Sequence, residues 1–297
     1  MNTAFDTDGS LYMGSRRDPA GCRVGLFGVP YDGTTSFRPG TRFGPAAIRE
    51  VSNGLETYCP QLDRDLDDLA FADLGAVDIP FGAPEPVVEA VRESTEAVLN
   101  LGLRPLMLGG EHSISSGAVA AVAARYPDMV MVQLDAHADL RDGYDGEHFS
   151  HAAAMRRCLD FPGVELVSVG IRNISAGEVP FLEANRDRIH IYWGKDRAAW
   201  NVEEIVSHLA GKTVYITFDL DGFDASLMQA TGTPEPGGVF WDDAVRIIRR
   251  ATEVAGEVVG ADINELAPIE GLHSCNFLAA KLAYKILGYR FAAKAAA

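Results

Sequence analysis

The chain has few basic residues and no long uncharged apolar run. Lysine and arginine together number 26 against 42 aspartate and glutamate residues, giving a formal net charge of −16. This balance argues against an extended nucleic-acid-binding surface, and it favours metal ions, cationic ligands or solubility alone. No uncharged apolar run reaches the roughly 18 residues of a membrane span, and the polar N-terminus lacks the apolar core of a secretion signal. We therefore expect a soluble, cytoplasmic protein that binds neither nucleic acid nor membrane.

Cysteines are also scarce. Cys22, Cys59, Cys158 and Cys275 lie far apart and form no CxxC pair. Such spacing provides neither a dense disulfide framework nor a thiolate metal site, and it indicates reduced thiols.

Short apolar segments alternate with longer amphipathic segments along the chain. The expected strands are residues 22–30, 104–110, 129–135, 164–172, 213–221 and 258–266, and the expected helices are 84–102, 114–127, 151–160, 201–211, 241–256 and 276–291. This alternation predicts an α/β fold with a mostly parallel sheet and helices on both faces. Because no linker interrupts the pattern, we expect residues 1–297 to form a single domain, with an N-terminal arm over 1–20 and a frayed tail over 292–297.

Potential metal ligands follow one expected strand at alternating positions. Asp135, His137 and Asp139 come directly after the apolar run "MVMVQL". If the backbone stays extended there, all three side chains point to the same side. Two carboxylates beside an imidazole are electrostatically costly unless a cation neutralises them. The alternative for the triplet is strand-end capping with salt bridges.

The same kind of residue follows two further strands. Asp219 and Asp221 come after "TVYITF", and His112 comes after "RPLMLGGE". Because ligands bind at the carboxyl ends of parallel strands, we expect all these side chains at one edge of the sheet. Mixed oxygen and nitrogen ligands suit a hard divalent ion such as Mn²⁺. Six ligands exceed the needs of one catalytic ion, so the sequence predicts two metals about 3.5–4 Å apart.

Several long motifs, in order, resemble the signatures of the ureohydrolase family, which includes arginases and agmatinases. They are "GGEHS", "DAHADLRD", "SHAAAMRR", "TFDLDGFDASLMQATGTPEPGG" and "ADINELAP". Near the N-terminus, "YDGTTSFRPGTRFGPAAIRE" and "LETY" resemble agmatinase-type members. The resemblance implies a three-layer α/β/α fold and two Mn²⁺ ions per subunit. It also implies a homo-oligomer, trimer or hexamer, and hydrolysis of a guanidino group to urea and an amine by a metal-bridging hydroxide.

The resemblance also assigns a role to each candidate side chain. One manganese ion would be held by His112, Asp135, Asp139 and Asp219, and the other by Asp135, His137, Asp219 and Asp221. Asp135 and Asp219 would then bridge the two ions.

Three residues are candidates for catalysis on the same basis. Asp139 would accept a hydrogen bond from the hydroxide and pass on its proton. His151 would exchange protons between solvent and the leaving amine, since imidazole titrates near neutral pH. Glu265 would anchor the planar guanidinium through paired hydrogen bonds. The alternative for His151 is a histidine at the start of a helix with no catalytic role. The alternative for Glu265 is a solvated acid at the end of a strand.

Two positions depart from the family pattern. Glu111 stands in "GGEHS" where aspartate is commoner, and we expect it behind the ligands rather than on a metal. Ala152 replaces a common glycine beside His151, which would narrow the pocket.

The expected substrate follows from the charge near the predicted pocket mouth. Asp142, Asp145 and Glu147 follow the metal triplet, with Arg141 the only base. This balance favours an amine-ended guanidino substrate such as agmatine, which yields putrescine. Arginine, guanidinobutyrate and guanidine remain open. A two-metal phosphoesterase and a non-catalytic metal-binding relative are rival functions; the first would need cations to hold phosphate, and the second would be expected to lack a ligand or the shuttle.

Overall fold

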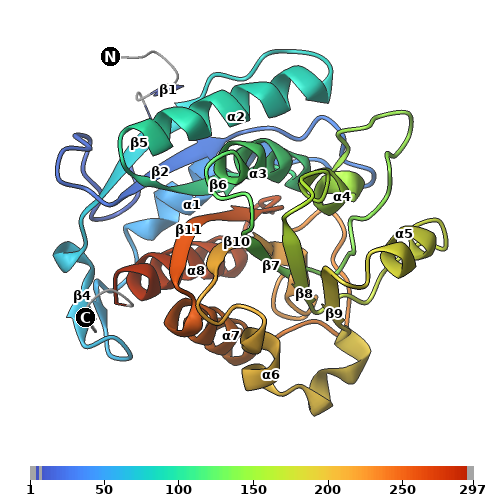
Figure 1. Ribbon diagram of the computed structural model, residues 1–297. Coiled ribbons are helices and arrows are strands. Elements are labelled where there is room, and N and C mark those ends of the chain that lie inside the picture. The colour runs from blue at the N-terminus through green and yellow to red at the C-terminus, as the bar shows by residue number, and fades with distance from the viewer. Residues whose placement is uncertain (1–4, 7–8, 293–297) are drawn as a thin grey trace.

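A nine-stranded sheet forms the centre of the computed structural model, which describes residues 5–6 and 9–292 (Figure 1). Its strands are β1 (Phe5–Asp6), β2 (Val24–Val29), β5 (Phe71–Val77), β6 (Arg104–Gly109), β7 (Val130–Leu134), β8 (Glu165–Val169), β9 (Ile189–Tyr192), β10 (Thr213–Asp219) and β11 (Glu257–Asn264). They lie in the order β1, β5, β2, β6, β11, β10, β7, β8 and β9. Only β1 runs antiparallel to its neighbour, so the prediction of a mostly parallel sheet is confirmed.

Helices cover both faces of the sheet. One face packs against α1 (Gly44–Ser52), α6 (Val202–Ser207), α7 (Trp241–Val254) and α8 (His273–Ala292). The other face packs against α2 (Pro84–Asn100), α3 (Ser115–Ala123), α4 (Ala154–Cys158) and α5 (Val179–Ala184). The three-layer α/β/α prediction is therefore confirmed. A separate antiparallel hairpin consists of β3 (Tyr58–Cys59) and β4 (Arg64–Asp65).

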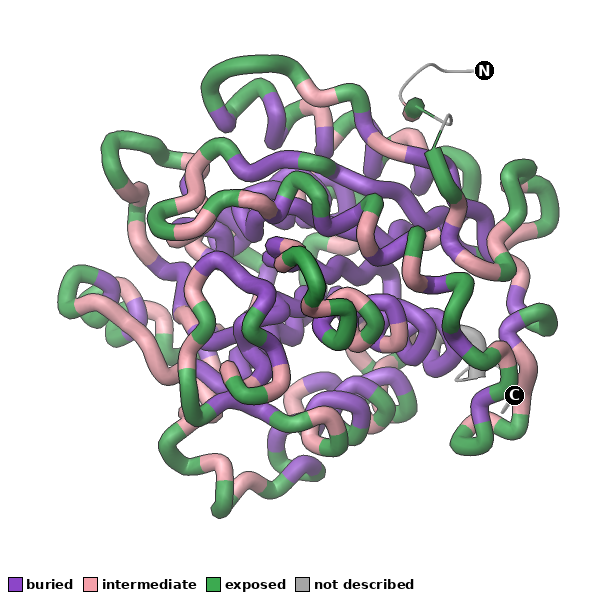
Figure 2. Tube along the Cα trace, turned by 180° about the vertical axis from the view of Figure 1, so that it is seen from behind, coloured by how far each residue is buried: buried purple, intermediate pink, exposed green. Residues whose placement is uncertain are grey.

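The central strands are apolar on both sides because each face meets a layer of helices. In β10, Val214, Ile216 and Phe218 belong to the core on the α8 side, whereas Tyr215 belongs to the core on the α3 side. This alternation follows the two-residue period of a strand. Figure 2 shows the buried strands enclosed by helices whose outer turns are exposed.

Strand β5 was missed because it contains a charged residue. Asp73 interrupts its apolar run, yet the structure buries this side chain. Arg49 of α1 donates to both carboxylate oxygens at 2.8 Å, and Tyr12 N donates to Oδ2 at 2.9 Å. A buried carboxylate is tolerated when it is paired in this way, and such pairing cannot be read from local sequence.

Most predicted boundaries differ from the structure by a few residues. The predicted helix over 151–160 begins as a 3-10 turn, His151–Ala153, and the predicted helix over 114–127 ends at Ala123. Short or weakly patterned elements were not predicted: α1, α5, β1, β3, β4 and β9. Part of the predicted arm (1–4 and 7–8) and the predicted tail beyond Ala292 lie outside the described residues. Within the described ranges, no helix combines the length and apolar character that crossing a membrane requires.

Candidate metal centre

Four adjacent strands in the middle of the sheet carry the predicted site at their carboxyl ends. These strands are β6, β11, β10 and β7. His112 follows β6, Glu265 follows β11, Asp219 ends β10 and Asp135 follows β7. Residues that are up to 153 positions apart in the chain thus meet at one edge of the sheet. This is the edge at which open parallel sheets bind ligands.

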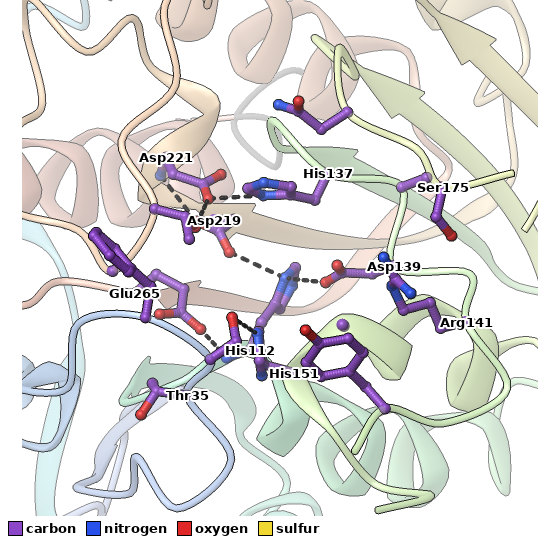
Figure 3. Close-up of a pocket in the computed structure, with 18 of the residues that line it drawn as sticks. Thr35, His112, His137, Asp139, Arg141, His151, Ser175, Asp219, Asp221 and Glu265 are labelled. Atoms are coloured by element: carbon purple, nitrogen blue, oxygen red, sulfur yellow. Dashed lines mark hydrogen bonds and ion pairs between the residues drawn. The ribbon is translucent and has the colours of Figure 1, made fainter. Parts of the chain in front are cut away.

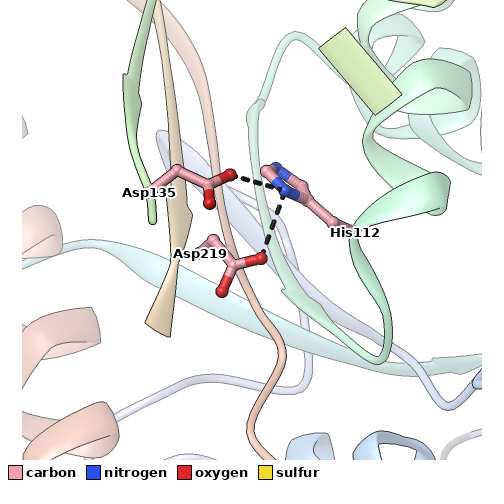
Figure 4. A group of neighbouring side chains, drawn as sticks. All are labelled: His112, Asp135 and Asp219. Carbon is pink, nitrogen blue, oxygen red and sulfur yellow. Dashed lines mark ion pairs between the residues drawn. The ribbon is translucent and has the colours of Figure 1, made fainter. Parts of the chain in front are cut away.

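His112 lies among three carboxylates. Its Nδ1 atom is 3.2 Å from Asp135 Oδ2 and 3.3 Å from Asp219 Oδ2 (Figure 4), and it also lies 3.2 Å from Asp139 Oδ2. This buried nitrogen nevertheless has no well-aligned hydrogen-bond partner. A nitrogen lone pair and carboxylate oxygens converging on one point fit a divalent cation.

A second group of ligands shares Asp135 with the first. His137 Nδ1 lies 2.9 Å from Asp221 Oδ2 and 3.8 Å from Asp135 Oδ1. Among the described residues, the potential ligand atoms of His112, Asp135 and Asp219 lie within 4.8 Å of one another, as do those of Asp135, His137 and Asp221. Two neighbouring groups with a common carboxylate fit the predicted pair of metal ions.

Burial and mutual repulsion make the uncompensated cluster costly. Burial raises the pKa of Asp135 to about 7, with the charges of Asp139 and Asp221 acting in the same direction. Burial also raises the pKa of Asp219 well above its usual value, again with help from Asp221 and Asp135. Both causes disfavour ionised carboxylates, and a bound cation would oppose both.

Neutral and acidic side chains behind the cluster orient its ligands. Thr217 Oγ1 donates to the buried Asp262 at 2.6 Å and lies 2.8 Å from His112 Nε2. Because the single hydroxyl proton goes to Asp262, Nε2 donates to Thr217, which turns Nδ1 towards the carboxylates. Gln133 likewise donates to Asp135 Oδ2 at 2.8 Å. Sequence analysis missed Thr217 and Gln133, although both point inward from strands that end at the site.

Two predicted catalytic carboxylates sit on unusual backbone. Asp139 has φ of 52° and Glu265 has φ of 69°, in the left-handed region that side chains other than glycine rarely adopt. Surrounding hydrogen bonds hold them there: Arg156 N donates to Asp139 O at 2.9 Å, and Glu265 N donates to Gly110 O at 2.8 Å. Glu265 Oε1 also accepts from His112 N at 2.7 Å. Such strain concentrates at functional sites.

A close approach of chain segments explains the paired glycines before Glu111. A Cβ atom on Gly110 would lie 1.9 Å from Tyr31 O, so only glycine fits there. Glu111 N donates to the same carbonyl at 2.8 Å. The loop after β2 is thereby held against the end of β6.

A cavity of about 310 Å³ opens above the cluster (Figure 3). It is lined by these predicted site residues: His112, His137, Asp139, His151, Asp219, Asp221 and Glu265. Asp135, the remaining one, is buried beneath them. The cavity therefore gives a small molecule access to the ligands, the histidine and the anchoring carboxylate together.

His151 is held by the loop after β2. Its Nδ1 atom lies 3.3 Å from Thr34 Oγ1 and its Nε2 atom 3.1 Å from Ser36 Oγ. Thr34 in turn donates its hydroxyl proton to Glu111 Oε1 at 2.5 Å and its backbone N–H to Glu111 Oε2 at 2.7 Å. Glu111 thus lies behind the ligands and supports the histidine through Thr34. The sequence offered no signal for this bridge.

The acids expected at the mouth do not line the cavity. Asp142 faces Arg157, whose Nη2 donates to Asp142 Oδ1 at 2.8 Å, and neither Asp145 nor Glu147 contributes to the wall. The cavity wall therefore gives no support to the charge argument for an amine-ended substrate. Loop residues that are adjacent in sequence can point in different directions, so their charges need not face the same cavity.

The outer wall instead carries two arginines, Arg38 and Arg141. Glu178 is an acid of this wall, but it is buried and accepts hydrogen bonds from Leu140 N at 2.9 Å and Ser175 N at 2.6 Å. Its carboxylate thus joins two loops and also faces Arg141, whose Nε lies 3.9 Å from Glu178 Oε2.

Known proteins resemble this chain in fold and in sequence over most of its length. Residues 22–288 match the Arginase family. An agmatinase of Bacillus subtilis is 38% identical over 88% of this chain and 89% of its own length. An N(1)-aminopropylagmatine ureohydrolase of Synechocystis is 34% identical over 88% of this chain and 87% of its own length. The solved structure of an agmatine ureohydrolase of Thermoplasma volcanium superimposes with a TM-score of 0.86 at 33% identity, covering 95% of this chain and 94% of that one. The chain therefore belongs to the arginase family and is a ureohydrolase, an enzyme that hydrolyses C–N bonds of amidines.

Proposed function

We propose that this enzyme hydrolyses a linear guanidino compound, with agmatine as the first candidate, to urea and an amine such as putrescine. The observation that carries the proposal is the pair of ligand groups sharing Asp135 beneath a cavity that also exposes Glu265 and His151. The relatives named above act, by their names, on agmatine or on an aminopropyl derivative of it, and this favours agmatine.

The ligand set fits two divalent cations, and its hard oxygen donors favour Mn²⁺. One ion would be held by His112, Asp135, Asp139 and Asp219, and the other by Asp135, His137, Asp219 and Asp221. When bound, such a pair lowers the pKa of water towards neutrality and so supplies hydroxide at working pH.

Glu265 and Asp139 would act on the substrate and on the water. Glu265 is held by His112 N through Oε1, and a guanidinium that pairs with its carboxylate would lie over the metal centre. Asp139 would accept the proton that the water loses as its oxygen attacks the guanidino carbon. Their fixed backbone limits the reorganisation needed during the reaction.

His151 would deliver a proton to the departing amine. Since Thr34 gives its own hydroxyl proton to Glu111, its oxygen can accept from His151 Nδ1–H. That arrangement leaves Nε2 as the nitrogen that exchanges protons beside Ser36, on the cavity wall.

A guanidino acid is the second candidate substrate. Arg38 and Arg141 line the outer wall and would attract a carboxylate at the far end of the substrate. Arginine and guanidine are further alternative substrates.

Urea release by the Mn²⁺-loaded protein tests the function. The substrates are agmatine, arginine, guanidinobutyrate and guanidine at matched concentrations, with p-nitrophenyl phosphate as a probe of phosphoesterase activity. We expect urea with agmatine preferred. Urea mainly from guanidinobutyrate would transfer the assignment to guanidino acids. No urea from any substrate, with Mn²⁺ or another divalent metal, would contradict the proposal.

Substitution of Thr34 tests its link to His151. We expect Thr34→Val to lower kcat about tenfold and to alter the pH profile of kcat, because His151 loses the acceptor for Nδ1. Thr34→Ser keeps the hydroxyl and should behave like the wild type. Metal content, measured by mass spectrometry, should be unchanged in both. Equal kcat and pH profiles for the valine and serine variants would rule out this link.

We also propose that residues 1–297 form one domain and assemble as a homotrimer or homohexamer. Light scattering of the purified protein measures the assembly, and a monomer would contradict it.

A further inference from the structure

A buried thiol and a buried amine meet far from the metal centre. Cys59 lies in β3 and is 1% exposed, and Lys285 lies in α8 and is 7% exposed. Lys285 Nζ is 3.1 Å from Cys59 Sγ. The two residues are 226 positions apart in the chain, so the contact joins the β3–β4 hairpin to the last helix.

The surroundings of Lys285 offer it little other compensation. Its Nζ donates to Gln61 Oε1 at 2.7 Å and lies 5.8 Å from the ring centre of Tyr289. Within the described parts of the chain, no carboxylate pairs with it. A buried ammonium without a counter-charge is costly, and the thiolate of Cys59 is the neighbouring group able to supply one.

The same pairing activates the thiol. Burial alone raises the pKa of Cys59, but the hydrogen bond from Lys285 and backbone N–H groups outweighs it and brings this pKa below its usual value. The thiolate is the nucleophilic form of cysteine. By contrast, burial raises the pKa of Cys158 and of Cys22.

Cys59 is covered by a thin layer of chain. Its neighbours Tyr58, Pro60 and Gln61 are all exposed, and the hairpin is only two residues wide on each strand. Local opening of such a hairpin would admit a small oxidant, because short peripheral elements open more readily than the central sheet.

We propose that Cys59 and Lys285 form an oxidative cross-link, with a peroxide as oxidant. The thiolate sulfur attacks the peroxide, so an S–O bond forms and the O–O bond breaks. The leaving hydroxide takes a proton from the Lys285 ammonium and departs as water, giving a sulfenic acid and a neutral amine. The Lys285 amine then attacks that sulfur, so an N–S bond forms, the S–O bond breaks and a second water leaves. The net change is the loss of two hydrogens from the protein, matched by reduction of one peroxide to two waters.

The link would tie the hairpin to α8 without touching the metal centre. It closes a ring over residues 59–285, which restricts the unfolded chain and stabilises the native one. We therefore expect oxidised protein to unfold at a higher temperature than reduced protein, at unchanged metal content.

Mass spectrometry of the peroxide-treated, full-length protein tests the link. After thiol blocking and digestion, we expect the Cys59 and Lys285 peptides joined, at a mass about 2 Da below their sum. Dithiothreitol should separate them. Cys59→Ser should abolish the product, whereas Cys158→Ser should leave it unchanged.

Lys285→Arg is the matched variant, since arginine keeps the charge but lacks the nucleophilic amine. It should leave Cys59 oxidised to sulfenic or sulfinic acid without a cross-link. The proposal is overturned if wild-type Cys59 stays reduced while Cys22 oxidises, or if it oxidises to sulfinic acid with Lys285 unlinked. The wild-type measurement decides the question even if a variant does not fold.

Discussion

Asp219→Asn is expected to lower kcat/KM by at least about 10³-fold and to abolish stabilisation by added Mn²⁺. Asp219 is the proposed bridge that ends β10, and its Oδ2 lies 3.3 Å from His112 Nδ1. Asparagine keeps the shape and the acceptor for Asp221 N, which donates to Oδ1 at 2.8 Å. The variant thus removes the charge of a ligand while leaving the local hydrogen bond in place.

Thermal unfolding separates metal binding from folding in this experiment. Wild-type protein should gain stability when Mn²⁺ is added and lose it with a chelator, since a ligand that binds only the native state stabilises it. Without metal, the variant should unfold no earlier than the wild type, because burial and the charges of Asp221 and Asp135 already disfavour this carboxylate.

The exposed Asp242→Asn, in the first turn of α7, is the control for the change in net charge. It should resemble the wild type in rate, metal content and stabilisation. A variant at Asp219 that kept two metals and the full rate would refute its role as a bridge.

Glu265→Gln is expected to lower kcat/KM about 10²- to 10³-fold while metal content stays at the wild-type level. Glutamine can still accept from His112 N, as Glu265 Oε1 does at 2.7 Å. It offers an amide N–H₂ group where the proposal needs a second carboxylate oxygen, and that group repels a guanidinium. The loss should therefore fall on the substrate and spare the metals.

Steady-state kinetics with metal analysis check this result. Glu147→Gln is the control, because this exposed acid belongs to the loop before His151 but does not line the cavity. Its kcat/KM should match the wild type. If Glu265→Gln also matched the wild type, the guanidinium would have to be anchored elsewhere.

Local sequence patterns predicted the fold because a sheet that is buried on both faces needs strands that are largely apolar. The segments that form β7 and β10 are apolar at most positions, and α2 begins at Pro84 and is followed by Gly102. The exceptions were elements whose stability comes from partners distant in sequence. Strand β5 needs Arg49 to neutralise Asp73, and no local pattern reports that pairing.

The site was partly predictable for the same reason. Acids and histidines placed directly after apolar strands have one available location, the carboxyl edge of a parallel sheet, and Asp135, His137 and Asp219 are found there. Side chains in long loops are not held at that edge, so their positions could not be predicted in the same way. Asp142 was expected at the mouth, but it pairs with Arg157 and does not line the cavity.

The sequence by itself determined the α/β fold, the family resemblance and the residues proposed as ligands, because periodicity and strand-end chemistry are local properties of a chain. Only the tertiary structure decided which groups support those residues and what charge surrounds the cavity. The bridge from Glu111 through Thr34 to His151, and the arginines of the cavity wall, depend on segments that are distant in sequence. Contacts of that kind arise from packing, which no single segment encodes.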